Sequence, residues 1–408
     1  MKEWKEYKLV EFMQFNPKER IAKGQVARKI AMDQLVPFCR DVSSNIYEEY
    51  KGGAKFKNGD TIMARITPCL ENGKTSYISS LKPDEVAFGS TEYIVLRNIQ
   101  DVSDSRFVYY LSICPQIREV AIKSMVGSSG RQRVQQDVLE NYCMNLPSLP
   151  TQQKIANILS SLDDKIEVNR RINEQLEELA QALFKSWFVD FEPFKDGEFV
   201  ESELGMIPEG WKVCELKDFG QIICGKTPSK DNKDFYGGNI PFIKIPDMHN
   251  NIFVWNTTDW LSNKGDASQV NKRIPPYSIC VSCIATVGLV AINTTFAHTN
   301  QQINTIIPNN AFERYYLFEQ LKSMKEYIQN LGRGGTATLN VNTRLFGSIK
   351  VLRPSEKVLK EYDGVINGFF KKIELNQQEI THLTNLRDTL LPKLMSGEID
   401  VEQFNVIE

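Results

Sequence analysis

The most constraining feature of this sequence is an internal repeat, in which landmark residues recur at a fixed spacing of 207 positions. Trp4 recurs as Trp211 near the start of each half, and the segment Ile166–Asn169 recurs as Ile373–Asn376 near the end. One spacing that serves both regions indicates a tandem duplication. Between the landmarks the halves differ strongly, so we expect them to share a framework but not a surface.

Each half ends in a region whose apolar residues are spaced alternately four and three positions apart. This seam runs from Ile155 to Trp187 in the first half and from Tyr362 to Leu394 in the second. A period of about 3.5 residues sustained over several heptads is typical of a coiled coil. The sequence therefore predicts two long spacer helices, within 151–194 and 355–395, that form an antiparallel coiled coil. The alternative is that each helix packs only on its own globular domain.

The ends of these helices are marked by familiar signals. Thr151 is the expected N-cap of the first helix, and Pro193 and Gly197 bound its far end. Pro392 falls in the last turn of the second helix. Because proline removes a backbone donor, we expect that helix to end or kink near Leu391.

We draw two further expectations from polar residues within the helical regions. Asn169 and Asn376 occupy the same seam position in the two halves. A polar residue at such a position fixes the register of paired helices at some cost in stability. Asp163 and Asp164 lie beside a lysine, and we interpret them as part of a solvated helix face.

The blocks 1–150 and 211–354 are predicted to be globular domains of the α/β or α+β class. Short β-rich runs alternate in them with turns rich in Gly and Asn and with helical patches. The expected strands are residues 61–67, 92–97, 240–245, 279–285 and 302–307, and the expected helices are 107–123 and 311–330. Residues 195–210 are expected to form an exposed acidic linker, and residues 396–408 a tail.

The net charge of −2 is unevenly distributed. Residues 1–150 carry 21 basic and 18 acidic side chains, and residues 216–354 carry 15 and 9. Residues 151–215 carry 7 and 14, and residues 355–408 carry 6 and 10. Mildly basic blocks thus alternate with acidic helical regions, which allows local phosphate-binding surfaces, although ordinary variation is the alternative. Without a membrane-length apolar run or an apolar start, a cytoplasmic location is expected.

No pattern of a catalytic or metal site is found. The sequence has no phosphate-binding loop of the motor ATPases and no dinucleotide-binding glycine motif. His249, His298 and His382 are isolated in sequence, and Cys280 and Cys283 lack a second ligand pair, so we expect them to be core thiols. The alternatives are a stand-alone DNA methyltransferase or nuclease fragment, for which a cofactor loop or carboxylate cluster is missing, and a coiled-coil adaptor, which would not need two dissimilar heads.

Several polar loops carry side chains that suit contact with DNA. Arginine reads guanine, Asn and Gln read adenine, and Lys, Ser and Thr hold phosphates. The segments Gly127–Arg133 and Gly332–Thr336 occupy corresponding places in the two halves. Ordinary polar surface is the alternative for any one loop. The candidate DNA-binding residues are Arg65, Asn72, Lys74, Thr75, Arg131, Gln132, Arg133, Lys226, Thr227, Ser229, Lys230, Lys244, Asn300, Gln301, Gln302 and Arg333.

Several stretches resemble a known family, the specificity subunits of type I restriction–modification systems. They are Ala64–Lys74, Ser186–Pro193, Ser202–Lys212, Gly238–Lys244 and Asn300–Gln302. With the repeat, the resemblance spans nearly the whole chain. It departs at Arg353–Lys357, a degraded version of the proline-rich helix entry present at Pro147–Gln153.

The resemblance implies two target recognition domains, each reading one half of a split, asymmetric site in double-stranded DNA. It also implies that the helices act as a spacer and dock two methyltransferase subunits, for which Trp187, Phe188 and Leu390 are the candidate contacts. Those subunits would bind S-adenosylmethionine and methylate adenine, while restriction subunits carrying a motor would cut DNA. The chain itself is then expected to be non-catalytic, with no cofactor or metal.

Overall fold

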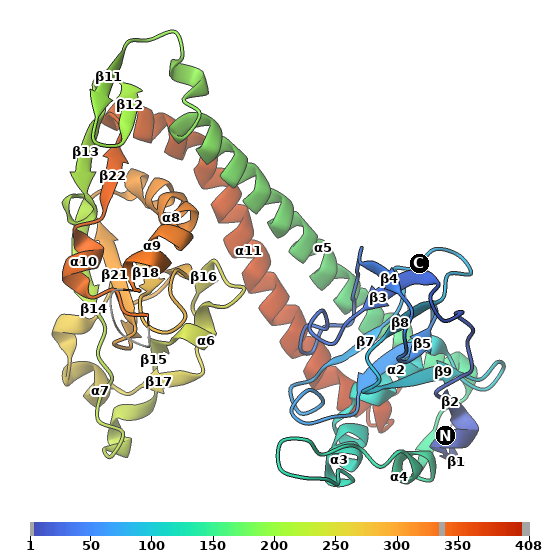
Figure 1. The fold of residues 1–408 in the computed structure, drawn as a ribbon. Helices are drawn as coiled ribbons and strands as arrows, with labels where there is room; N and C mark the ends of the chain where they lie inside the picture. Colours follow the sequence, from blue (N-terminus) through green and yellow to red (C-terminus); the bar gives the residue numbers. More distant parts are fainter. Residues whose placement is uncertain (1–3, 334–338, 402–408) are drawn as a thin grey trace. The chain divides into compact units, whose positions relative to one another are not determined.

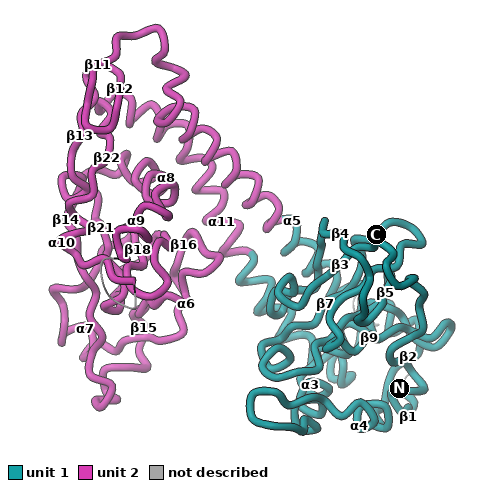
Figure 2. The backbone as a smooth tube through the Cα atoms, viewed as in Figure 1, with its two compact units in different colours: residues 1–168, 380–408 teal, residues 169–379 magenta. Residues whose placement is uncertain are grey.

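The computed structural model describes residues 4–333 and 339–401 of the chain. The chain divides into two compact units (Figure 2), of which the first comprises residues 1–168 and 380–408 and the second residues 169–379. The division falls inside both long helices, so each unit combines one globular block with part of each helix. In the described part of the chain, no helix has both the length and the apolar character needed to cross a membrane.

The long helices are α5 (Leu149–Phe188) and α11 (Glu356–Met395), each of 40 residues (Figure 1). α5 begins before Thr151, so Thr151 lies in the first turn and the prediction that it is the N-cap was wrong. α11 continues past Pro392 and ends at Met395, as the predicted range 355–395 has it, so the helix does not end near residue 391. A proline in a last turn removes only one backbone hydrogen bond, and burial of Leu394 in the core of the first unit favours continuation.

The globular part of the first unit contains three small sheets. Its strands are β1 (Lys5–Lys8), β2 (Met13–Phe15), β3 (Val26–Ile30), β4 (Tyr47–Glu49), β5 (Lys55–Phe56), β6 (Thr61–Ala64), β7 (Thr75–Tyr77), β8 (Ala87–Gly89), β9 (Tyr93–Asn98) and β10 (Cys143–Leu146). Its short helices are α1 (Leu9–Phe12), α2 (Ser105–Ile113), α3 (Pro115–Lys123) and α4 (Gln136–Glu140). The central sheet has the antiparallel order β2-β9-β6-β7, a second sheet has the order β4-β3-β8-β5, and β1 pairs with β10.

The second unit has a larger central sheet. Its strands are β11 (Phe199–Ser202), β12 (Gly205–Pro208), β13 (Lys212–Glu215), β14 (Gly220–Cys224), β15 (Tyr236–Ile243), β16 (Phe253–Val254), β17 (Asp259–Leu261), β18 (Ile279–Ser282), β19 (Val290–Asn293), β20 (His298–Thr299), β21 (Ile303–Pro308) and β22 (Lys350–Arg353). Its helices are α6 (Ile245–Met248), α7 (Asn263–Ala267), α8 (Arg314–Ser323), α9 (Lys325–Leu331) and α10 (Thr343–Gly347), with 3-10 turns η1 (Glu192–Phe194), η2 (Leu216–Phe219), η3 (Lys233–Phe235), η4 (Val270–Lys272) and η5 (Ala311–Glu313). The central sheet has the order β14-β21-β18-β19-β16, and β17-β15-β20 forms a second sheet.

The internal repeat is confirmed at the level of strand register. β1 pairs with β10 so that Lys5 faces Leu146, and β13 pairs with β22 so that Lys212 faces Arg353. Both partners of the first pair are displaced by the same 207 residues in the second. The order β2-β9-β6-β7 likewise matches β14-β21-β18-β19. The two units therefore share a backbone framework.

Two local expectations differ from the structure. The helix expected over 107–123 is split into α2 and α3, because Pro115 lacks the donor needed within a helix but suits the first position of a new one. The expected linker 195–210 contains the antiparallel hairpin of β11 and β12, in which Ile207 and Pro208 are buried. Cys280 and Cys283 are buried in and beside β18, as predicted.

The long helices pack antiparallel within each unit, as the seam predicted. In the second unit, Nδ2 of Asn169 donates to Glu379 at 2.8 Å, and Nδ2 of Asn376 donates to the side-chain oxygen of Asn173 at 2.8 Å. Residue numbers rise along α5 as they fall along α11, which defines the antiparallel direction. Asn169 and Asn376 are fully buried, so both predicted seam asparagines lie in the interface.

The expectation that Asp163 lies on a solvated helix face was wrong. Its side chain is 3% exposed and that of its partner Arg387 is 4% exposed. Arg387 donates to one carboxylate oxygen at 2.7 Å, and the hydroxyl of Tyr110 donates to the other at 2.7 Å. The sequence pattern failed because the counter-charge comes from α11, far along the chain. Asp164 does face solvent, where it pairs with Arg40 at 2.6 Å.

A buried glutamate is predicted to make the stability of the second unit depend on pH. Glu319 of α8 is 2% exposed, and its Oε1 has no hydrogen-bond partner among the described residues. Burial raises its pKa from 4.5 to about 7, with Glu177 acting in the same direction and Lys322 against it. As pH rises from about 4.5 to about 7, the unfolded chain loses this proton first, so folding loses about 3 kcal/mol.

Glu319→Gln should therefore raise the free energy of unfolding at pH 8 by about this amount and change it little at pH 4. Denaturant unfolding at the two pH values measures the difference. Glu326→Gln, an exposed change on the following helix α9, is the control and should have no effect at either pH. Equal effects of Glu319→Gln at both pH values would contradict the prediction.

Candidate nucleic-acid interface

Polar segments of the first unit meet where three strands of the central sheet end. β2 and β6 both pair antiparallel with β9, so their carboxyl ends lie at the same edge as the amino end of β9. Asn16–Arg20 follows β2, Arg65–Thr67 follows β6, and Thr91–Glu92 precedes β9. Arg131–Arg133 joins them through a β-bridge to Ile66. We call these four segments the first strand-end face.

The second unit builds an equivalent edge from its own central sheet. Gly225–Lys230 follows β14, Cys283–Thr286 follows β18, and Asn300–Gln302 precedes β21. Asn340 joins them through a β-bridge to Ile284. We call these residues the second strand-end face. Most of the candidate DNA-binding residues thus fall on one edge of equivalent sheets, although the sequence predicted the loops one by one.

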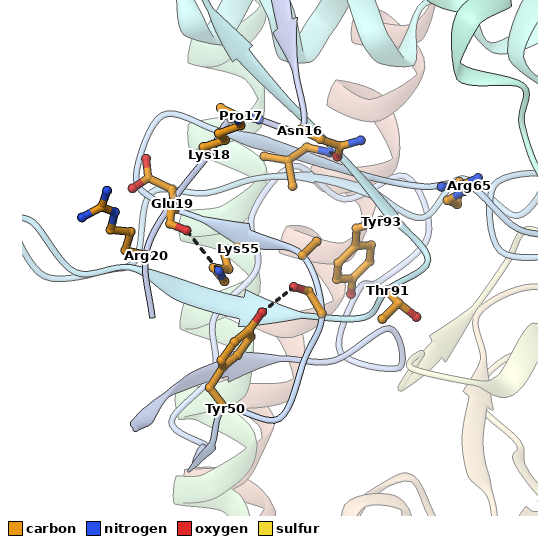
Figure 3. Close-up of a pocket in the computed structure, with 13 residues that line it drawn as sticks. Asn16, Pro17, Lys18, Glu19, Arg20, Tyr50, Lys55, Arg65, Thr91 and Tyr93 are labelled. Atoms are coloured by element: carbon orange, nitrogen blue, oxygen red, sulfur yellow. Dashed lines mark hydrogen bonds between the residues drawn. The ribbon is translucent and has the colours of Figure 1, made fainter. Parts of the chain in front are cut away.

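A groove of about 560 Å³ opens on the first strand-end face (Figure 3). Its basic lining residues are Lys18, Arg20, Lys55 and Arg65. Glu19 also lines it, but its carboxylate is paired with Arg97 at 2.7 Å. Nε of Arg65 is buried and has no hydrogen-bond partner among the described residues. The groove is therefore net positive and offers donors to an acceptor-rich ligand such as a nucleic acid.

Arg133 is held in an ion pair on the same face. Its Nε and Nη2 donate to both carboxylate oxygens of Glu92 at 2.7–3.1 Å, and the two side chains are 45% and 24% exposed. The hydrogen bond from Arg133 holds the pKa of Glu92 below its usual value, and the charge of Arg65 acts in the same direction. Glu92 is therefore ionised at neutral pH, between two arginines.

The loop after β14 is held close to the second sheet. A Cβ at position 225 would lie 2.2 Å from the carbonyl oxygen of Asn300, so only glycine allows this approach. The N–H of Lys226 donates to the carbonyl of Thr299 at 2.9 Å. The hydroxyl of Thr227 donates to the side chain of Gln301. Two candidate segments that are distant in sequence thus form one surface.

A buried histidine, His298, supports this loop through a chain of hydrogen bonds, although no role for it was predicted. Its Nε2 lies 2.8 Å from Asp266, and its Nδ1 lies 3.3 Å from Gln269, whose Nε2 donates to the carbonyl of Lys226 at 3.0 Å. Burial lowers the pKa of His298, while Asp266 opposes the shift. The histidine is a support beneath the face and does not reach its surface.

The candidate DNA-binding residues differ in accessibility. Those exposed to solvent are Asn72, Arg131, Arg133, Lys226, Ser229, Lys230, Gln301 and Arg333, and those half-buried are Arg65, Lys74, Gln132, Thr227, Lys244 and Gln302. Asn300 is buried, and its amide donates to Gln302 at 2.9 Å, so it braces that side chain. The part of the predicted Gly332–Thr336 segment from residue 334 onward lies outside the described residues.

One of these candidates requires correction, and two others are already bonded within the protein. Thr75 is 1% exposed, because β7 begins there and turns its side chain into the interior. Lys74 donates to the carbonyl of Met32 at 2.8 Å, and Lys244 is ion-paired with Asp259. The apparent polar turn at 71–76 therefore supplies packing and internal hydrogen bonds, and Thr75 cannot touch a ligand in this conformation.

The candidate partner contacts pack on the cores of the two units. Phe188 is 3% exposed in the core of the second unit, and Trp187 packs against the same core. Leu390 packs, partly buried, against the core of the first unit. Phe188 is therefore covered by its own unit, whereas Trp187 and Leu390 are only partly buried and stay predicted partner contacts.

Sequence reasoning missed Asn16–Arg20 and Glu92 as members of the first face. The internal repeat held a signal for the first of these segments. Under the spacing of 207 residues, Lys226 and Thr227 correspond to Glu19 and Arg20. The repeat therefore indicates this segment, which side-chain chemistry alone does not. Glu92 carried no signal, because its partner Arg133 is far away in sequence.

The comparison with known families decides which family the chain represents. The Type I restriction modification DNA specificity domain matches residues 1–178 and again residues 208–385. The chain belongs to this family. The two matched segments correspond to the two halves of the internal repeat, so the chain carries two DNA specificity domains in tandem.

Relatives extend the match along the chain. The chain is 38% identical to the type I restriction enzyme HindI specificity subunit of Haemophilus influenzae, over 87% of this chain and 90% of that protein. It is 30% identical to the MjaIX specificity subunit of Methanocaldococcus jannaschii, over 75% and 72%. The crystal structure of a type I restriction–modification S subunit from M. genitalium has the same fold, with a TM-score of 0.58, 15% identity and 96% of both chains covered.

Proposed function

We propose that this chain is the DNA sequence-recognition subunit of a type I restriction–modification complex. Each unit reads one half of a bipartite, asymmetric site, and α5 and α11 set the spacing between the halves. The observation that carries the proposal is the pair of equivalent strand-end faces, built on one framework with different side chains. A site with two different halves needs two readers of the same build and different chemistry.

Mapping methylated adenines in DNA from cells that carry the chain and its methyltransferase partner tests this function. The expected result is a bipartite motif, with two defined half-sites separated by a gap of fixed length. Methylation that requires this chain but follows a single continuous motif would contradict the proposal. So would methylation that persists unchanged after the chain is deleted.

We also infer that the chain is not itself a catalyst. Its sequence lacks a cofactor-binding loop, and its family is defined by DNA specificity domains. S-adenosylmethionine is then bound by separate methyltransferase subunits, and cleavage belongs to restriction subunits. The purified chain should show no methyltransferase, nuclease or ATPase turnover. Robust turnover by the pure chain would favour the alternative, a stand-alone DNA methyltransferase or nuclease fragment.

The long helices are proposed to dock two methyltransferase subunits through exposed apolar residues. Val168 and Leu179 of α5 are 49% and 55% exposed, and Leu375 and Leu386 of α11 are 52% and 38% exposed. Val168 corresponds to Leu375 and Leu179 to Leu386 under the spacing of 207 residues. Each unit thus carries an equivalent set of exposed apolar residues, which suits two identical partners, and the net acidic helical regions are unsuited to lie along phosphates.

Charging these positions should remove the partners one at a time. Leu179→Glu and Leu386→Glu should each weaken one methyltransferase site by about 2 kcal/mol or more. The double variant should weaken both sites. The number of methyltransferase subunits per chain, measured by mass in solution, tests this. Leu204→Glu, an equally exposed change in the turn between β11 and β12, should have no effect. Full stoichiometry in the double variant would contradict the assignment.

A further inference from the structure

The pairing of Arg133 with Glu92 leaves one edge of the guanidinium unoccupied. An arginine carries five N–H donors in a planar fork. Glu92 accepts hydrogen bonds from Nε and from Nη2, so it occupies the edge of the guanidinium that includes Nε. The remaining edge, formed by Nη1 and the second N–H of Nη2, has no partner among the described residues. Glu92 thus holds Arg133 in one orientation and leaves a parallel pair of donors free, on a side chain that is 45% exposed.

A parallel pair of donors matches the N7 and O6 acceptors of guanine in the major groove. A phosphate could accept from the same edge, but Glu92 is ionised and lies in direct contact with Arg133. Although Arg65 adds a positive charge nearby, the pair itself has no net charge, so Arg133 attracts an anion less than an unpaired arginine would. A base edge carries only partial charges, so this arrangement favours a base over the backbone.

The second unit carries different side chains at the equivalent backbone positions. The N–H of Arg65 donates to the carbonyl of Glu92 at 2.9 Å, as the N–H of Cys283 donates to the carbonyl of Gln302 at 2.7 Å. Arg133 bridges the residue after Arg65, as Asn340 bridges the residue after Cys283. Glu92 therefore corresponds to Gln302 and Arg133 to Asn340. Amide side chains at such positions suit the N6 and N7 groups of adenine.

We propose that Arg133 reads a guanine in the half-site bound by the first unit, with Glu92 as its positioning residue. Asn340 is the equivalent base-reading position of the second unit and favours adenine, with Gln302 at the place of Glu92. The inference rests on the proposed function, which it deepens by assigning one base-pair position in each half-site to named residues.

Methylation mapping with the full chain and its methyltransferase partner tests this assignment. Arg133→Ala should relax one G·C position in one half-site, lowering discrimination there by about 5- to 150-fold. The other half-site should stay intact. Asn340→Ala should do the reverse, relaxing one A·T position in the other half-site only. Arg133→Lys keeps the charge but loses the fork, so it should relax the same position as Arg133→Ala.

Glu92 variants separate positioning from charge. Glu92→Ala should relax the same G·C position and strengthen binding to unrelated DNA, because Arg133 is freed to meet phosphates. Glu92→Gln keeps one acceptor and should retain part of the discrimination. The control is Lys123→Ala, which breaks the exposed Lys123–Glu119 pair on α3 and should leave both half-sites unchanged.

Two results would overturn the inference alone. One is a wild-type bipartite motif whose G·C and A·T positions are unchanged in every variant. The other is a uniform loss of affinity in Arg133→Ala, with a salt slope lower by about one and unaltered sequence preference, which identifies a phosphate contact. A wild-type chain that directs no bipartite methylation would overturn the proposed function, and this inference with it.

Discussion

Asp163→Ala is expected to lower the free energy of unfolding of the first unit by about 3–5 kcal/mol. The change leaves the guanidinium of Arg387 without its main counter-ion, although that side chain is only 4% exposed. It also removes the acceptor of the Tyr110 hydroxyl. Asp388 still accepts from Nε of Arg387 at 2.9 Å, but it is 55% exposed, so the desolvation of the buried guanidinium is no longer fully offset. Denaturant unfolding of the full chain measures the loss.

The second unit supplies the control for this prediction. Under the spacing of 207 residues, Asp163 corresponds to Phe370 and Arg387 to Ala180. Phe370 stacks on Tyr315 with ring centroids 4.2 Å apart, so the second unit has an apolar layer where the first has an ion pair. The double change Asp163→Phe with Arg387→Ala should recover most of the loss, since well-packed apolar residues often replace a buried pair without penalty. A double variant as unstable as Asp163→Ala would show that the pair has no apolar substitute here.

Asp163 also shows where sequence reasoning ends. The repeat, the two domains and the helix seams were predictable, because local periodicity and a constant spacing record them directly. The seam asparagines Asn169 and Asn376 were found for the same reason, and both are buried as expected. A charge on a helix, however, is assigned to solvent unless its partner is known. The partner here is Arg387, which meets Asp163 only after α5 and α11 have paired.

The side chains of the candidate interface were predictable from the sequence, but their positions on the two sheets were not. Loops such as Gly225–Lys230 and Asn300–Gln302 were recognised from their side chains, and the sheet topology then brought them to one edge. Thr75 was misassigned, because a polar residue after a glycine turn looks exposed when the strand that follows is not seen. Glu92 was missed, because its role depends on contact with Arg133, which is brought to it by a β-bridge.

The largest functional effect is expected from lengthening the two helices together. A heptad inserted after Arg170 in α5 and another after Gln377 in α11 fall at equivalent positions of the repeat. A heptad preserves the seam, and inserting it in both helices preserves the antiparallel pairing on each side. It adds about 10 Å of helix. At about 3.4 Å per base pair, the gap in the recognised site should grow by at most about 3 base pairs.

Both half-sites should stay the same in this variant, because the strand-end faces are untouched. Methylation mapping reads the gap and the half-sites in one experiment. The control is the same heptad inserted after Glu203, in the turn of the β11–β12 hairpin, which should leave the gap unchanged. A heptad in α5 alone cannot keep Asn169 in register with Glu379 and Asn173 in register with Asn376 at the same time, so it should impair folding or assembly. If the two-helix variant methylates DNA with the wild-type gap, the helices do not set the spacing, and the distance between half-sites must be fixed by the partner subunits.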